Sequence, residues 1–178
     1  MSHETKAPDP APTKKARVVR PFDTRCEMTW IVMPGDCNAL DTVFGGQVCS
    51  WIDVCAAVAA QRFTHTDVVT AAMDQLVFKA PIRRGKVAVL QAMVNWAGRT
   101  SMEIGVRVEE ECPTTGVRTQ TSTAYLTFVA VNSALQPIEV PTLAPHTKDE
   151  HRRFREAEHR RADRLAHRAR IQASRGAP

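Results

Sequence analysis

The chain has 178 residues, of which 43% are hydrophobic and 24% charged, a composition typical of one globular domain. No apolar run approaches the roughly 20 residues that cross a membrane, so we expect no membrane insertion. The net charge of +5 comes from the two ends: residues 1–20 carry five Lys/Arg against two acids, and residues 148–178 carry ten against five. Because a nucleic-acid-binding domain carries its positive charge on the folded body, we expect no nucleic-acid partner.

The N-terminal segment, residues 1–20, mixes Pro, Ala, Lys and Asp with few large apolar side chains, and we predict that it is disordered. It has no hydrophobic stretch after its charges, unlike a secretory signal. The five cysteines form no C-x-x-C pair, and two of them lie in an apolar segment, where a thiol packs as a small hydrophobe. We therefore expect a reducing, cytoplasmic location.

The folded body is predicted to span residues 21–147. It begins with a short strand, RCEMTWIVMP, and a turn-rich loop. A helix follows from about Gly46 to Arg62, apolar on nearly every side, which is typical of a buried helix. Four stretches of strand character come next, over residues 68–81, 85–98, 100–111 and 117–132. Their short connections predict that they are antiparallel neighbours.

One arrangement buries such a helix among these strands. It is an α+β fold in which the antiparallel sheet curls around the helix. The C-terminal segment, residues 148–178, contains good helix formers and opposite-charge pairs four residues apart, such as Asp149 and Arg153. Only three of its side chains are large and apolar, so we expect a solvated, partly frayed helix. It either keeps the protein soluble or docks to a partner such as an acidic protein or nucleic acid.

Asp53 is the one carboxylate in the apolar helix. Positions three or four residues apart share a helix face, so Gly46, Ser50, Asp53 and Ala57 lie on one stripe. Burying an unpaired carboxylate is costly. Asp53 therefore lies at a wet edge, or bonds a neighbouring subunit to fix packing, or serves as a general base that activates water.

A glycine pair precedes this acid. The first amides of a helix lack intrahelical acceptors and lie at its positive end, so a carbonyl oxygen can approach Gly46 as it would an oxyanion hole. Asp53 lies seven residues further, about 10 Å along the axis, which is too far to act on that carbonyl. If two such helices lie antiparallel across a two-fold axis, Asp53 of one subunit can approach Gly46 of the other.

Four stretches carry a family resemblance: residues 38–62, NALDTVFGGQVCSWIDVCAAVAAQR, followed by VVTAAMDQLVFKAPIRRGKV, GRTSMEI and TFVAV. They resemble the hotdog-fold acyl-CoA thioesterases, in particular the bacterial YciA group and the cytosolic hydrolases related to brain acyl-CoA hydrolase. The resemblance covers about residues 25–143. It implies a hotdog fold, a long helix wrapped by a curved antiparallel sheet. It also implies hydrolysis of acyl-CoA to fatty acid and coenzyme A without metal or cofactor. The family forms dimers of hotdogs, commonly assembled further into hexamers as trimers of dimers, with active sites at the subunit interface.

The resemblance assigns roles by position. Asp53 matches the catalytic acid that activates or orients water, Asn38 matches a loop asparagine that helps to place the water or the thioester, and Gly46 with Gly45 matches the amide that polarises the carbonyl. A turn beside the coenzyme A channel corresponds to Gly98, Arg99, Thr100 and Ser101. Candidate partners for the CoA phosphates, or else ordinary solvated loop charges, are Lys79, Arg83, Arg84 and Arg99.

Two residues depart from the family pattern: Asp41 adds a negative charge beside the site, and Gln47 replaces a bulkier residue. Other chemistries find less support. The six histidines show no metal-ligand spacing, and we predict no metal site. The helix supplies no histidine, which argues against a dehydratase. The alternative function is that of a non-catalytic hotdog module that senses acyl-CoA.

Overall fold

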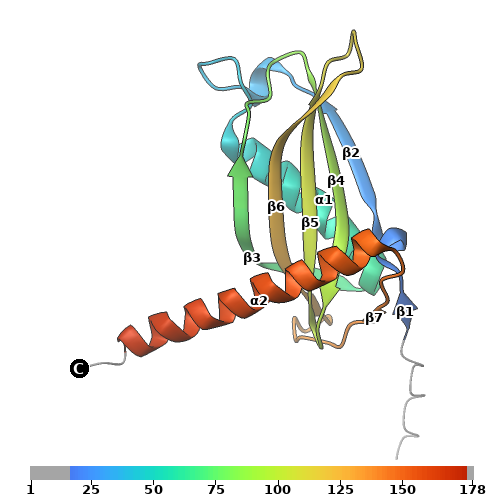
Figure 1. Ribbon diagram of the computed structural model, residues 1–178. Coiled ribbons are helices and arrows are strands. Elements are labelled where there is room, and N and C mark those ends of the chain that lie inside the picture. The colour runs from blue at the N-terminus through green and yellow to red at the C-terminus, as the bar shows by residue number, and fades with distance from the viewer. Residues whose placement is uncertain (1–16, 176–178) are drawn as a thin grey trace, which may run out of the picture.

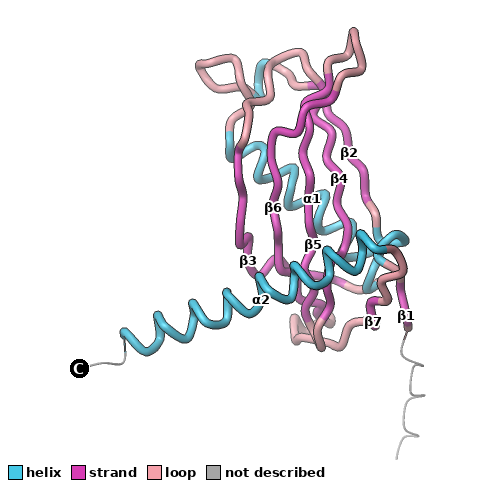
Figure 2. Tube along the Cα trace, viewed as in Figure 1, coloured by secondary structure: helices cyan, strands magenta, loops and turns pink. Residues whose placement is uncertain are grey.

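The computed structural model describes residues 17–175 and has an α+β architecture (Figure 1). Five strands form one antiparallel sheet in the order β2-β4-β5-β6-β3. Their bounds are β2 (Cys26–Ile31), β3 (Asp67–Phe78), β4 (Val87–Ala97), β5 (Ser101–Glu111) and β6 (Arg118–Val131). Helix α1 (Gly45–Thr64) packs on one face of the sheet, and helix α2 (Lys148–Arg175) crosses the other face (Figures 1 and 2). The predicted hotdog arrangement of one long helix against an antiparallel sheet is confirmed.

Shorter elements complete the chain. Strands β1 (Val18–Val19) and β7 (Thr142–Leu143) pair in parallel, and two 3-10 helices, η1 (Pro21–Thr24) and η2 (Pro34–Asp36), flank β2. Most of the predicted disordered segment lies outside the described residues, but β1 belongs to its last four residues. Within the described part of the chain, neither helix has the length and apolarity needed to cross a bilayer.

Helix α1 supplies one side of the hydrophobic core. Its buried side chains face the sheet and follow the helical period: Val48, Trp51, Ile52, Cys55, Ala56, Ala59, Ala60 and Phe63. The indole of Trp51 stacks on that of Trp30 from β2, with ring centroids 5.4 Å apart. The opposite stripe of the helix, with Gly46, Ser50 and Val54 exposed, is uncovered in the protomer. The helix is thus buried on one side and open on the other.

Strand β5 shows how alternation divides the sheet into two faces. Met102, Ile104, Val106 and Val108 are buried in the core beneath α1, as the pattern predicts. The residues between them, Glu103, Gly105 and Arg107, face the other side, yet Glu103 is only 1% exposed. α2 therefore covers this face where Glu103 lies, whereas Arg107, further along the strand, stays exposed.

The predicted neighbour relation of β3 and β4 is wrong. β3 pairs with β6 at one edge of the sheet, whereas β4 lies between β2 and β5. The eight residues 79–86 cross the sheet's end instead of forming a hairpin. An extended segment of that length spans about 26 Å, more than the roughly 14 Å between strands three positions apart. The crossover is fixed to the loop before α1, because the Val43 amide donates to the Ile82 carbonyl at 2.8 Å.

The C-terminal helix also differs from the expected solvated helix. Its first half docks on the outer face of the sheet, burying Ala157. Arg160 donates to both oxygens of Glu103 at 2.7 and 3.2 Å and lies over the ring of Tyr125, and Arg164 pairs with Asp74. The second half extends past β3 (Figure 1). Arginine stems and buried ion pairs attach the helix where large apolar side chains are few.

Candidate active site

The start of α1 offers unpaired amides. The helix begins after Phe44, whose extended backbone is followed directly by the glycine pair and whose side chain provides no cap. Among residues 17–175, the amides of Gly45 and Gly46 donate to no acceptor, while those of Gln47 and Val48 donate to the Phe44 carbonyl. Two unpaired N–H groups at the positive end of a helix form a position that favours a negatively charged oxygen.

The two glycines have different constraints. A side chain at Gly46 would overlap the ring of Phe44, whereas one at Gly45 would make ordinary contact with Phe78 at 3.7 Å. Gly46 is also exposed, so an approaching group can reach its amide. A side chain at position 46 would therefore displace the exposed ring of Phe44, whereas glycine leaves that ring in place beside the amide.

Asn38 lies in the loop that leads to this helix end. Its Oδ1 accepts hydrogen bonds from the Leu40 amide at 2.9 Å and from the Thr42 hydroxyl at 3.2 Å, so this oxygen holds the loop together. The side-chain amide nitrogen has no acceptor among the described residues. Asp41, in the same loop, has φ of 56°, a left-handed conformation that Asp tolerates better than most residues.

Asp53 lies halfway along α1, half-buried beside the edge strand. Its Oδ1 accepts a hydrogen bond of 2.7 Å from the hydroxyl of Thr70 on β3. Thr70 lies at an irregularity of the β3–β6 pairing, where the register shifts between it and Ala72. Thr70 does not stand out in the sequence, because a threonine in a β-branched run is an ordinary strand residue. Only the position of β3 beside α1 shows its contact with the acid.

The uncovered side of α1 is continuous with an apolar edge. Five large side chains between 42% and 61% exposed lie along α1, the residue before it and β3: Phe44, Val54, Val69, Val77 and Phe78. β3 is an edge strand, and one of its sides presents unpaired backbone groups. Asp53 and the glycine amides open onto this same side, about 10 Å apart along one helix.

Sequence comparison with known proteins shows the family of this chain. The model of the thioesterase superfamily matches residues 40–117. YkhA of Bacillus subtilis, named as an uncharacterized acyl-CoA thioester hydrolase, is 40% identical over 119 residues, which are 67% of this chain and 69% of that protein. The chain belongs to the acyl-CoA thioester hydrolases of this superfamily. Mouse acyl-coenzyme A thioesterase 11 is 36% identical over 80% of the chain, which spans only 24% of that longer protein.

Solved structures agree with this assignment. An acyl-CoA hydrolase from Staphylococcus aureus, in complex with butyryl coenzyme A and coenzyme A, superposes with a TM-score of 0.82 at 30% identity, covering 88% of this chain and 96% of that one. A hexameric acyl-CoA thioesterase superposes with a TM-score of 0.83 at 37% identity, covering 86% and 98%. Further structures of the S. aureus hydrolase carry single alanine substitutions of an aspartate, an asparagine and a threonine.

The candidate coenzyme A contacts fall into two groups. Lys79, Arg83 and Arg84 lie in the crossover beside the start of α1, where Arg84 pairs with Asp41 at 3.3 Å and the Arg83 amide donates to Glu110 at 2.7 Å. The turn at 98–101 joins β4 to β5 at the opposite end of the sheet. One protomer therefore does not bring the two groups together.

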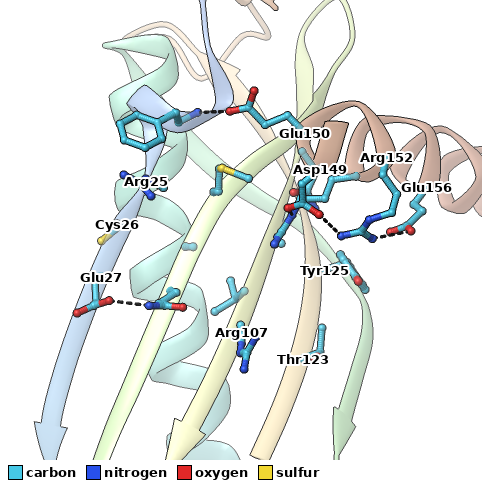
Figure 3. A pocket seen from close by; sticks show the side chains of 18 of the residues that line it. Arg25, Cys26, Glu27, Arg107, Thr123, Tyr125, Asp149, Glu150, Arg152 and Glu156 are labelled. Atoms are coloured by element: carbon cyan, nitrogen blue, oxygen red, sulfur yellow. Dashed lines mark hydrogen bonds and ion pairs between the residues drawn. The ribbon is translucent and has the colours of Figure 1, made fainter. Parts of the chain in front are cut away.

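A hollow of about 920 Å³ lies elsewhere, on the outer face of the sheet beneath α2. Figure 3 shows Arg107, Tyr125 and Glu156 among the side chains around it. The sheet separates this hollow from Asp53 on α1, but Lys79, one of the candidate coenzyme A contacts, lies on its lining. Among the described residues, no group of three His, Cys, Asp or Glu side chains is placed to hold a metal ion.

Proposed function

We propose that this hydrolase cleaves acyl-CoA to a free acid and coenzyme A at a site shared by two protomers. The Gly46 amide of one protomer binds the developing oxyanion, and Asp53 of the partner subunit acts on water. The observation that carries the proposal is the pair of unpaired amides at the start of α1, on the same open side of the protomer as Asp53.

The proposed reaction is a general-base hydrolysis of the thioester. Asp53 takes a proton from water while the water oxygen attacks the thioester carbonyl carbon. The Gly46 N–H stabilises the negative charge that forms on the carbonyl oxygen, with the side-chain amide of Asn38 orienting the water or the thioester. The carbon–sulfur bond then breaks, and the departing thiolate takes up a proton. An oxyanion donor contributes roughly 10²–10³ in rate and a general base about 10²–10⁴.

The dimer follows from distance and from exposed surface. About 10 Å separates Gly46 from Asp53 along one helix, so a single protomer cannot use both on one carbonyl. An antiparallel two-fold contact along α1 and β3 would bring one protomer's acid to its partner's amides. It would also bury the apolar edge of Phe44, Val54 and Phe78. A hexameric relative is consistent with further assembly into a trimer of dimers.

The substituted residues in the S. aureus structures support these roles. Its asparagine and aspartate are 15 residues apart, and its aspartate and threonine are 17 apart. Asn38, Asp53 and Thr70 have the same residue types at the same spacings in this chain. We therefore place Thr70 in the site as the residue that positions the Asp53 carboxylate.

The same dimer would bring together the two groups of candidate coenzyme A contacts, the crossover and the turn at 98–101. In an antiparallel dimer, the turn of one protomer approaches the crossover of the other, which would place both groups along one bound coenzyme A. Their members are Lys79, Arg83, Arg84, Gly98, Arg99, Thr100 and Ser101. The reaction proposed here uses no metal or cofactor. A cytosolic location follows the rat relative named as a cytosolic acyl-CoA hydrolase, which is 33% identical over 73% of the chain.

Hydrolysis of an acyl-CoA panel, followed through release of the free thiol, tests the proposal. We expect turnover by the wild type and a loss of about 10³-fold or more in Asp53→Asn, because the general base is removed. Asp163→Asn, an exposed carboxylate on α2, is the matched control and keeps full activity. Binding without turnover, equal in wild type and Asp53→Asn, would instead indicate the acyl-CoA sensor.

A further inference from the structure

A second hollow, of about 210 Å³, lies next to the unpaired amides. It is enclosed by the start of α1, the end of β3 and the crossover, and apolar side chains such as Val48, Phe78 and Ile82 line most of it. Gly45 also lines it, so the hollow begins where the proposed mechanism holds the thioester carbonyl. None of the described residues that line it is cationic.

Among residues 17–175, Ser122 of β6 supplies the one hydroxyl that lines this hollow. The residue is 1% exposed, and its Oγ has no hydrogen-bond partner in the described part of the chain. On the same strand, the buried hydroxyl of Thr121 is satisfied by the Val108 carbonyl at 3.2 Å. Because nearly all buried hydroxyls in folded proteins are paired, an unpaired one that faces a cavity points to a ligand atom that completes it.

We propose that this hollow holds the acyl chain and that Ser122 selects acyl groups carrying a hydrogen-bonding oxygen, such as hydroxyacyl chains. The inference rests on the proposed hydrolysis at Gly46. The lining fits this occupant better than it fits coenzyme A. The phosphates of coenzyme A need cations, and its pantetheine amides need several polar partners, whereas the hollow offers apolar walls and one hydroxyl.

The test compares kcat/KM for 3-hydroxybutanoyl-CoA and butanoyl-CoA, which differ by one hydroxyl. In the wild type we expect a preference of about fivefold to tenfold for the hydroxyacyl substrate, the discrimination that one hydrogen bond gives. Ser122→Ala should abolish the preference by slowing the hydroxyacyl substrate alone. Ser133→Ala, an exposed serine in the loop after β6, is the control and should leave both rates unchanged.

Folding and binding measurements separate the outcomes. Ser122→Ala should keep or raise Tm, because it removes an unsatisfied buried hydroxyl. The inference is overturned if the wild type shows no preference for the hydroxyacyl substrate. It is also overturned if Ser122→Ala slows both substrates equally, a result that would place the coenzyme A arm in the hollow. If the wild type hydrolyses neither substrate, the proposed function fails. Calorimetric affinities for the same two compounds then still show whether Ser122 discriminates between them.

Discussion

Replacing Thr70 by valine tests how the catalytic acid is oriented. The change keeps the shape of the side chain and removes the hydroxyl that donates to Asp53 Oδ1 at 2.7 Å. A hydrogen bond to a charged group is worth about 1.5–3 kcal/mol, and the lower value applies here because Thr70 is exposed in the protomer. At about 1.4 kcal/mol per factor of ten, we expect kcat to fall roughly tenfold.

The assay measures kcat and KM separately by thiol release. Because Thr70 contacts the acid and not the coenzyme A groups, KM should stay within about twofold. Thr70→Ser restores the hydroxyl and should recover most of kcat. A Thr70→Val enzyme with the kcat of wild type, or a Thr70→Ser enzyme as slow as the valine variant, would refute the positioning role.

Three further predictions concern α2, a cysteine and acid stability. Arg160→Met should lower the free energy of unfolding, measured in urea, by about 3 kcal/mol, because it leaves the buried Glu103 unpaired. Adding Glu103→Gln should recover much of this loss. If the losses of the two single variants simply add in the double variant, the pairing is contradicted. Hydrogen bonds, the strongest from Thr114, lower the pKa of the Cys112 thiol to about 6, so its iodoacetamide alkylation, followed by mass spectrometry, should rise through pH 6 and plateau by pH 8. Burial alone would raise the pKa of Glu150, but backbone amide donors outweigh it and hold this pKa below its usual value. The stability that Glu150 provides is therefore complete above a glutamate's ordinary pKa of about 4.3 and is lost as the pH falls below it. Glu150→Gln should lower Tm at pH 7 and flatten the acid part of the Tm–pH curve.

Local patterns predicted most of the elements, because alternation and helical period are properties of neighbouring residues. The helix at Gly45–Thr64 and the alternating faces of Ser101–Glu111 follow directly from their side-chain spacing. The order of the strands does not follow in the same way. The position of β3 depends on the path of residues 79–86. A segment of that length allows either a hairpin or a crossing of the sheet's end.

The candidate site was predictable only in part. Asp53 and the glycine pair stand out, since an acid in an apolar helix and glycines at a helix start are unusual chemically. Thr70 and Ser122 do not stand out, because threonine and serine in strands are common, and their roles depend on which groups face them. The arginines that attach α2 likewise resemble solvated charges until Glu103 is seen buried opposite Arg160.

Activity of mixed subunits tests the shared site most directly. Asp53→Asn lacks the acid, and Gly46→Pro lacks the amide hydrogen at a helix start, where proline is best tolerated. Each variant alone should be inactive while circular dichroism shows a folded protein of unchanged oligomeric size. When the two are co-expressed in equal amounts, random pairing across a two-fold axis leaves about one quarter of the sites with an intact acid and an intact amide. We expect recovery of about 25% of wild-type kcat, whereas a mixture as inactive as its components would show that both groups act within one protomer.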